Sequence, residues 1–149
     1  MNALNSLAKV VIAILIGILV HRISQDRKKR VFISFDYDND HQLKKWMIAQ
    51  SKRKNSPFEI MDYSLKEAAP ERDWEKKAWG KICQSDLVMV LLGRHTHKAP
   101  GVLKEVKMAR KAGKPIIQVK GHNDYKLNRV SGAGKLYRWS WENLRKILS

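Results

Sequence analysis

The sequence predicts an α/β fold in which a parallel sheet carries helices on both faces, and one transmembrane helix precedes that fold. Two observations support this prediction. An apolar run near the start of the 149-residue chain is long enough to cross a bilayer, and short apolar runs farther along alternate with segments of helical periodicity. Strands that alternate with helices favour a parallel sheet joined by right-handed crossovers. The length fits one ordinary domain.

The transmembrane helix is predicted at the N-terminus. Residues 10–20 (VVIAILIGILV) have no polar side chain, and the 18 residues from Ala3 to Val20 contain one charged residue, Lys9. At 1.5 Å per residue this stretch spans about 27 Å, which suffices for a bilayer core if Lys9 snorkels. A cleaved signal peptide and a buried helix are the alternatives. The basic residues follow the apolar run and no small-x-small cleavage site comes after it, so the pattern favours an anchor.

The charges after this helix predict its orientation. The segment 22–30 (RISQDRKKR) carries five Lys or Arg side chains and one Asp. The positive-inside rule therefore places the C-terminal part of the chain in the cytoplasm. We expect an anchor at residues 1–21, a basic juxtamembrane linker at 22–30 that can lie on anionic headgroups, and a domain at 31–149.

The domain is predicted to begin with a central strand at 31–35 (VFISF), because strand-forming apolar residues fill this run. Apolar residues then recur at helical spacing over 39–53, with Asn39 or Asp40 as the capping residue. A second, short strand is predicted at 58–61.

The middle of the domain repeats this alternation. A helix is predicted from Glu71, with acidic residues at its dipole-favoured start and one apolar face formed by Trp74, Ala78, Trp79 and Ile82. The run 86–92 (DLVMVLL) is apolar enough for a strand that is covered on both faces. Another helix is predicted over 101–112, and Gly113 ends it as a C-cap.

The last elements are a strand at 115–119 (PIIQV), a polar loop at 120–135 and a short edge strand at 136–139. Ser140 is predicted to cap a final helix. The inward residues of that helix are expected to be Trp141, Leu144, Ile147 and Leu148.

The composition limits the classes of partner. The chain has 30 Lys and Arg against 14 Asp and Glu, a formal net charge of +16. This excess favours anionic lipid, nucleic acid or phosphorylated small molecules without selecting one. Nucleic acid is disfavoured because basic and aromatic residues are not interleaved as stacking requires. The single cysteine, Cys83, excludes an intramolecular disulfide and a thiolate zinc site, and its predicted helix indicates a core position.

The functional surface is predicted at the carboxyl ends of the strands, where the strand order reverses. In a flavodoxin-like order 2-1-3-4-5, the loops after the first and third strands meet at this edge. These loops supply five candidate side chains, and Glu105 lies one turn into the helix that follows. The five are Asp36, Tyr37, Arg94, His95 and His97.

Several site chemistries compete at this edge. The carboxylates after the first strand resemble a magnesium phosphoacceptor site, but such a site needs an Asp where Gly93 stands. His95 and His97 offer two metal ligands without an assured carboxylate partner. Asp36 is as well suited to cap the following turn as to contact a ligand. Phosphate loops of the Walker or Rossmann type do not occur.

Three segments carry a resemblance to a known family. The phrases VFISFDYDND, DLVMVLLG and GVLKEVKMARKAGKPIIQVKG, in this order and spacing, resemble the TIR-like domain of the Thoeris antiphage protein ThsB and its relatives over roughly residues 30–120. The resemblance implies a flavodoxin-like TIR fold. Many members of that family use a glutamate in the helix after the fourth element to cleave NAD⁺ at the nicotinamide–ribose bond. Some of them release cyclic ADP-ribose isomers as immune signals.

The resemblance also implies roles for individual residues. By position the glutamate is Glu105, whose carboxylate would stabilise the oxocarbenium-like ribosyl cation. From the residues alone, a solvent-facing glutamate paired with a nearby cation is the alternative. Phe35, Asp36 and Tyr37 would line the substrate cleft, and Arg94 would hold the pyrophosphate. NAD⁺ would be a substrate, and neither a separate cofactor nor a metal is expected.

One position departs from the family pattern. Gly101 stands where many relatives have an aromatic residue, often Trp, that helps to wall the site four residues before the glutamate. The loop 62–70 matches in position the loop by which TIR domains stack on each other. The resemblance therefore implies homo-oligomers with head-to-tail TIR–TIR contacts, which could complete an active site between neighbours on a membrane.

Two functional hypotheses follow. The first is a single-pass enzyme of the inner membrane in bacterial antiphage defence, which hydrolyses or cyclises NAD⁺ to an ADP-ribose-type signal for a downstream effector protein. The second is a non-catalytic TIR-like oligomerisation and signalling module at the membrane. Gly101 favours the second hypothesis, whereas Glu105 together with the acidic and aromatic strand end favours the first.

Overall fold

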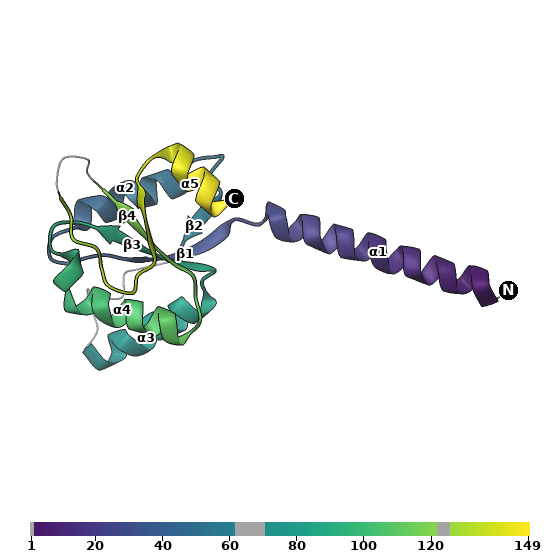
Figure 1. The fold of residues 1–149 in the computed structure, drawn as a ribbon, viewed down its shortest axis with the longest axis horizontal. Helices are drawn as coiled ribbons and strands as arrows, with labels where there is room; N and C mark the ends of the chain where they lie inside the picture. Colours follow the sequence, from purple (N-terminus) through teal and green to yellow (C-terminus); the bar gives the residue numbers. More distant parts are fainter. Residues whose placement is uncertain (1, 62–70, 122–125) are drawn as a thin grey trace.

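The computed structural model describes residues 2–61, 71–121 and 126–149, which form one long N-terminal helix and an α/β domain (Figure 1). The elements in chain order are α1 (Asn2–Asp26), β1 (Lys29–Ser34), α2 (His41–Ser51), β2 (Phe58–Ile60), α3 (Glu71–Gln84), β3 (Leu87–Leu92), the 3₁₀ helix η2 (Thr96–Lys98), α4 (Pro100–Lys111), β4 (Ile116–Lys120), β5 (Lys135–Arg138) and α5 (Trp141–Leu148).

The sheet has five parallel strands in the order β2-β1-β3-β4-β5. The register pairs Val31 of β1 with Leu87 of β3, and Val88 of β3 with Ile116 of β4. The predicted parallel sheet and its strand order are therefore confirmed. The order reverses between β1 and β3, so the loops after these two strands meet at the carboxyl edge of the sheet.

Helices cover both faces of the sheet (Figure 1). Val31 and Ile33 of β1 face one side and pack with Leu43 and Met47 of α2 and with Leu144 and Leu148 of α5. Phe32 faces the other side and packs with Trp74, Ala78 and Ile82 of α3 and with Ala109 of α4. The alternation of side chains along a strand produces this division.

The β4–β5 connection packs on the sheet without a helix in its described part. Gln118 of β4 is 1% exposed, and its amide accepts a hydrogen bond from Val130 N–H at 2.8 Å. Its Nε2 donates to the carbonyls of Val130 and Gly134, each at 3.1 Å. One buried amide thus bonds three backbone groups of this crossover and ties it to β4.

Two local predictions have opposite outcomes. Ser140 caps α5 as predicted, because its hydroxyl accepts a hydrogen bond from Asn143 N–H at 3.0 Å. The prediction that Cys83 is a core residue is wrong, because its side chain is exposed. Ile82 occupies the inward position of α3, and Cys83 lies about 100° farther around that helix.

Helix α1 extends away from the domain (Figure 1). Its stretch Ala3–Ile23, 21 residues, is long and apolar enough to cross a membrane. The large apolar side chains of this stretch are 48% to 77% exposed, which argues against the buried-helix alternative. An exposed apolar surface of this extent needs a lipid or protein environment.

A three-residue ion-pair cluster joins α1 to the sheet. Asp86 precedes β3, and its Oδ1 lies 3.0 Å from Arg27 Nη2 and 3.3 Å from Arg30 Nη2. Its Oδ2 accepts the backbone N–H of Arg30 at 2.8 Å. Burial raises the pKa of Asp86, but the hydrogen bonds from Arg30 and Arg27 outweigh it and lower that pKa to about 2.

We predict that Asp86→Asn lowers the free energy of unfolding of the full chain by about 1 kcal/mol near neutral pH. The folded-state pKa of Asp86 lies below its unfolded value, so this contribution is complete above the unfolded pKa and disappears as the pH falls through about 2. Denaturant titrations in detergent from pH 6 to pH 2 should show the difference between wild type and variant shrinking. A difference that stays constant with pH would contradict the ionic origin.

Candidate functional site

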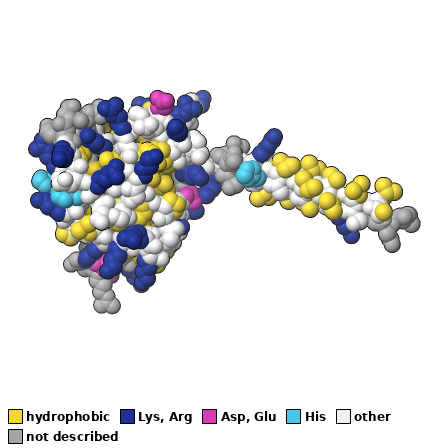
Figure 2. All heavy atoms as spheres, in the orientation of Figure 1, with side chains coloured by type: hydrophobic (Ala, Val, Ile, Leu, Met, Phe, Trp, Pro, Cys, Tyr) yellow, Lys and Arg dark blue, Asp and Glu magenta, His cyan; other side chains and the backbone are white. Residues whose placement is uncertain are grey.

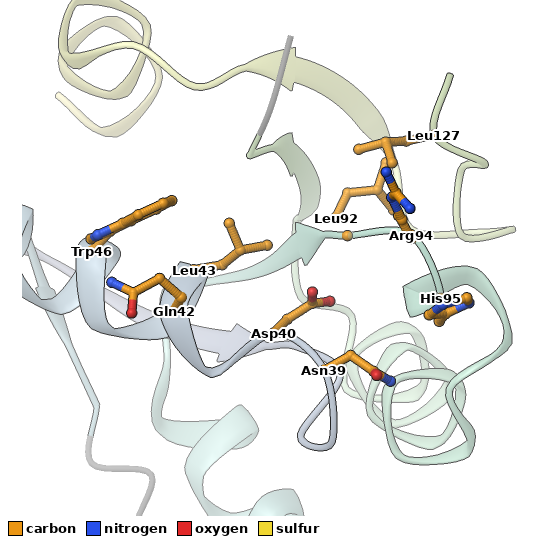
Figure 3. Close-up of a pocket in the computed structure, with 10 residues that line it drawn as sticks. Asn39, Asp40, Gln42, Leu43, Trp46, Leu92, Arg94, His95 and Leu127 are labelled. Atoms are coloured by element: carbon orange, nitrogen blue, oxygen red, sulfur yellow. The ribbon is translucent and has the colours of Figure 1, made fainter. Parts of the chain in front are cut away.

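A cleft of about 450 Å³ lies at the carboxyl edge of the sheet, where the strand order reverses (Figure 3). Helix α2 supplies one wall, and the segment after β3 supplies the other. The lining residues are Asn39, Asp40, Gln42, Leu43, Trp46, Leu92, Gly93, Arg94, His95 and Leu127. The position agrees with the site predicted from the strand order.

The floor of the cleft is a buried polar network. Asp40 is 9% exposed, and its Oδ2 accepts the Thr96 hydroxyl at 2.9 Å. Thr96 Oγ1 in turn accepts Gly93 N–H at 2.7 Å. Asp40 stands at the N-cap position of α2, but its side chain makes no capping hydrogen bond there. Its carboxylate instead ties the loop after β1 to the loop after β3.

Gly93 is required by the carboxylate of Asp40. A Cβ atom at position 93 would lie 2.2 Å from Asp40 Oδ1 and 2.3 Å from Oδ2. Neither oxygen can remain there beside a side chain, so the close approach of the two loops depends on a residue without one. The same position is where a magnesium phosphoacceptor site would need an aspartate.

The walls of the cleft combine an aromatic surface with cationic groups. Trp46 of α2 is 44% exposed and stands at one end, beside Gln42 (Figure 3). Arg94 and His95 line the opposite end, and both are exposed. An indole face suits a flat aromatic ring, and a guanidinium suits a phosphate. The cleft therefore has the chemistry to bind a nucleotide.

The predicted aromatic residues after β1 form a separate cluster. Phe35 is 6% exposed, and its ring centroid lies 6.3 Å from that of Tyr37 and 6.0 Å from that of His41. Tyr37 and His41 meet edge to face at 4.6 Å. Lys44 Nζ lies 5.3 Å from the centroid of Phe35. Phe35 thus belongs to the core on the α2 side, and Tyr37 covers it.

The carboxylate of Asp36 accepts hydrogen bonds within the turn that follows β1. Its Oδ1 accepts Asp38 N–H at 3.1 Å, and its Oδ2 accepts the side-chain amide of Asn39 at 2.7 Å. The Asp36 carbonyl also accepts Asp40 N–H at 2.8 Å. These bonds correspond to the turn-capping alternative for Asp36 and hold the loop that carries Asp40.

Glu105 is a buried glutamate, 5% exposed, on the inner side of α4. Val102, Val106 and Ala109 are buried on the same helix and turn that side toward the sheet. The Ser34 hydroxyl at the end of β1 donates a hydrogen bond to Glu105 Oε2. The alternative of a solvent-facing glutamate does not hold for this side chain. A buried carboxylate is costly unless it is hydrogen-bonded, and the Ser34 hydroxyl supplies such a bond.

Ser34 is the residue near the candidate site that sequence reasoning missed. It is fully buried and lies between apolar neighbours in the strand segment VFISF. A single hydroxyl in an otherwise apolar central strand was the available signal, because such a group needs a buried partner.

The structure brings only part of the predicted set into the cleft. Arg94 lines it, whereas Phe35, Asp36, Tyr37 and Glu105 are not among its lining residues. Ser34 pairs with Val90 in the register of β1 and β3, and Val90 lies three residues before Gly93. The Glu105 carboxylate that binds Ser34 is therefore about 10 Å from the level of Gly93 along the strand direction, toward the amino ends of the strands. Within the described residues, no group of three or more His, Cys, Asp or Glu could hold a metal ion.

Comparisons with known proteins agree with the fold that carries this site. The family model of the Thoeris protein ThsB, TIR-like domain, matches residues 32–126. The solved structure of the Clostridium botulinum CMP N-glycosidase BcmB superimposes with a TM-score of 0.51 and 22% sequence identity, covering 80% of this chain and 97% of that one. At this identity the likeness concerns the fold. No curated protein matches the chain.

We predict that Gly93→Ala destabilises the protein by about 2 kcal/mol, because the new methyl group displaces the Asp40 carboxylate from Thr96. Gly80→Ala is the matched control, since a Cβ atom there meets nothing within 4 Å inside helix α3. That control should stabilise by about 0.5 kcal/mol through helix propensity. Thermal melts of the two variants measure both effects, and equal melting temperatures would refute the steric argument.

Proposed function

The chain belongs to the TIR-like domain family of the Thoeris protein ThsB, and on this premise we propose that it is a membrane-anchored nucleotide-processing enzyme of antiphage defence. The proposed substrate is NAD⁺, and the proposed reaction is cleavage of its nicotinamide–ribose bond. The observation that carries the proposal is the buried carboxylate of Glu105, which Ser34 holds at the carboxyl side of the sheet.

The chemistry of such a cleavage suits an anionic Glu105. The C–N bond to the pyridinium ring breaks, and its electron pair leaves with nicotinamide as a neutral amide. The ribosyl fragment develops positive charge, which a nearby carboxylate stabilises. Water then adds to the ribosyl carbon and releases a proton, or an adenine nitrogen of the same molecule adds and closes a cyclic product. Glu105 acts as the stabilising anion, and Ser34 is a positioning residue that fixes its orientation.

The cleft supports the binding of a nucleotide. Trp46 would stack on a base and Arg94 would hold the pyrophosphate, in keeping with the aromatic and cationic character of the two walls. Glu105 lies about 10 Å below the level of Gly93 along the strand direction, so the proposal requires that the nicotinamide end of the substrate reach past the floor of the cleft toward Glu105. BcmB, whose fold is similar, is a CMP N-glycosidase, and an enzyme of that class cleaves the same kind of bond, between a base and a ribose.

Anchoring by α1 completes the proposal. The stretch Ala3–Ile23 would cross the inner membrane once, and the cationic residues that follow it favour a cytoplasmic domain. A cleaved signal sequence would have the same length and composition, so anchoring is tested directly by alkaline carbonate extraction of membranes. The predicted stacking loop, 62–70, and with it the assembly into homo-oligomers, lies outside the described residues.

Two observations favour the alternative function, a non-catalytic signalling module. Gly101 is half-buried at the start of α4 and offers no aromatic wall. Glu105 lines no part of the cleft. In a module of this kind, the bond from Ser34 to Glu105 would serve to dock α4 on β1.

We predict that the full chain in membranes releases nicotinamide from NAD⁺, and that Glu105→Gln lowers the rate by at least about 100-fold, because it removes the stabilising charge. Ser34→Ala should lower kcat by about tenfold with little change in KM, since it loosens the position of the carboxylate. Chromatography of nicotinamide and of the ribosyl product measures both effects.

Glu59→Gln is the matched control, because Glu59 is exposed on the edge strand β2, away from the cleft. It should retain the wild-type rate. Release that survives the Glu105 substitution would refute the site assignment. Absence of release from wild type at high protein density, with all variants folded, would favour the signalling module.

A further inference from the structure

The end of the domain that joins α1 is strongly basic. In a parallel sheet the amino ends of the strands lie beside the carboxyl ends of the connecting helices, and here this end comprises the segments 27–29, 52–57, 81–86, 110–115 and 145–149. We call it the basal edge. Its twelve cationic residues are Arg27, Lys28, Lys29, Lys52, Arg53, Lys54, Lys81, Arg110, Lys111, Lys114, Arg145 and Lys146. Within these described segments Asp86 is the one acidic side chain.

Helix dipoles explain only part of this charge. Cations favour the last turn of a helix, which accounts for residues such as Lys81 and Arg110. Seven of the twelve lie outside the helices, at 27–29, 52–54 and 114. The opposite edge is less basic, because its loop 35–40 carries three carboxylates beside cations such as Arg94 and Lys98. Figure 2 shows Lys and Arg side chains beside the point where α1 joins the domain.

The connection to α1 limits how far the basal edge can lie from the end of that helix. Asp26 ends the helix and Lys29 begins β1, so the two elements are at most about 11 Å apart. That upper limit is comparable to the Debye length, which is about 8 Å at physiological ionic strength. The bonds of Arg27 and Arg30 to Asp86 restrict the connection further.

From this arrangement we propose that the basal edge is a docking surface for anionic phospholipid headgroups, which seats the domain on the membrane with its cleft turned away from the bilayer. The inference rests on the anchoring by α1 that is part of the proposed function, and not on catalysis. Exposed Lys52, Lys54 and Lys146 would contact phosphates as flexible point charges.

The chain contains one natural attachment site for a spin label. Cys83 is the single cysteine, and it is exposed at the basal end of α3. A spin label on Cys83 of the full chain in nanodiscs reports its accessibility to a water-soluble nickel relaxant. We expect at least about a twofold lower accessibility with about 30% phosphatidylglycerol than with pure phosphatidylcholine. The difference should vanish in about 0.5 M salt, because salt screens charges of this kind.

Two triple variants provide matched charges. Lys52→Gln with Lys54→Gln and Lys146→Gln removes three exposed cations of the basal edge, and it should abolish most of the lipid dependence. Lys98→Gln with Lys126→Gln and Arg129→Gln removes three exposed cations elsewhere and should leave it unchanged. A second reporter, Lys98→Cys in a Cys83→Ser background, should be equally accessible in both lipids.

Equal accessibility of the Cys83 label in both lipids would overturn the proposal, as would an equal response of the two triple variants. Binding of duplex DNA that the basal triple variant abolishes, with no lipid dependence of the Cys83 label, would assign the surface to nucleic acid instead. Carbonate extraction of membranes that contain the full chain tests the anchor, and nicotinamide release tests catalysis. Failure of either is therefore distinguishable from failure of lipid docking.

Discussion

Parallel pairing of all five strands forces each connecting helix to run back toward the start of the next strand. As a result, the residues of the candidate site and the cationic residues of the basal edge lie at opposite ends of the strands. The strand ends bring Asp40, Thr96 and Gly93 together at the cleft, and they bring Ser34 within reach of Glu105. The helix ends gather cations around the exit of α1. A candidate site and a candidate membrane surface are thus separated by the full length of the strands.

Much of the fold could be predicted from hydrophobic patterning. The continuous apolar run of β3 and the glycine with φ of +65° after α4 both have direct physical meanings, and both predictions are confirmed. The patterns could not predict where buried polar groups find partners. Asp40 is expected from the sequence as a helix cap, yet its carboxylate binds Thr96, 56 residues away along the chain. Gln118 likewise binds the backbone of the β4–β5 connection, a segment whose sequence shows no hydrophobic periodicity.

The candidate site was less predictable than the fold. Its edge follows from topology, but the role proposed for Glu105 rests on family resemblance, because an isolated helical glutamate is ordinarily a surface residue. Trp46 is expected as one of the apolar residues at helical spacing, and its half-exposed ring instead forms the rim of the cleft. The prediction for Cys83 failed because a place in a helix does not by itself define which face a residue occupies, and Ile82 takes the inward position.

The short connection between α1 and β1 has a mechanical consequence. Only two residues separate the helix from the sheet, and Arg27 of this connection is paired with Asp86. Rotation of α1 about its axis would therefore reach the domain only through these two residues and the exposed ion pairs at Asp86. Any lateral packing of such helices in a bilayer would set the azimuth at which neighbouring domains face each other. The partner presented to each domain would then be selected within the membrane, before the folded surfaces meet.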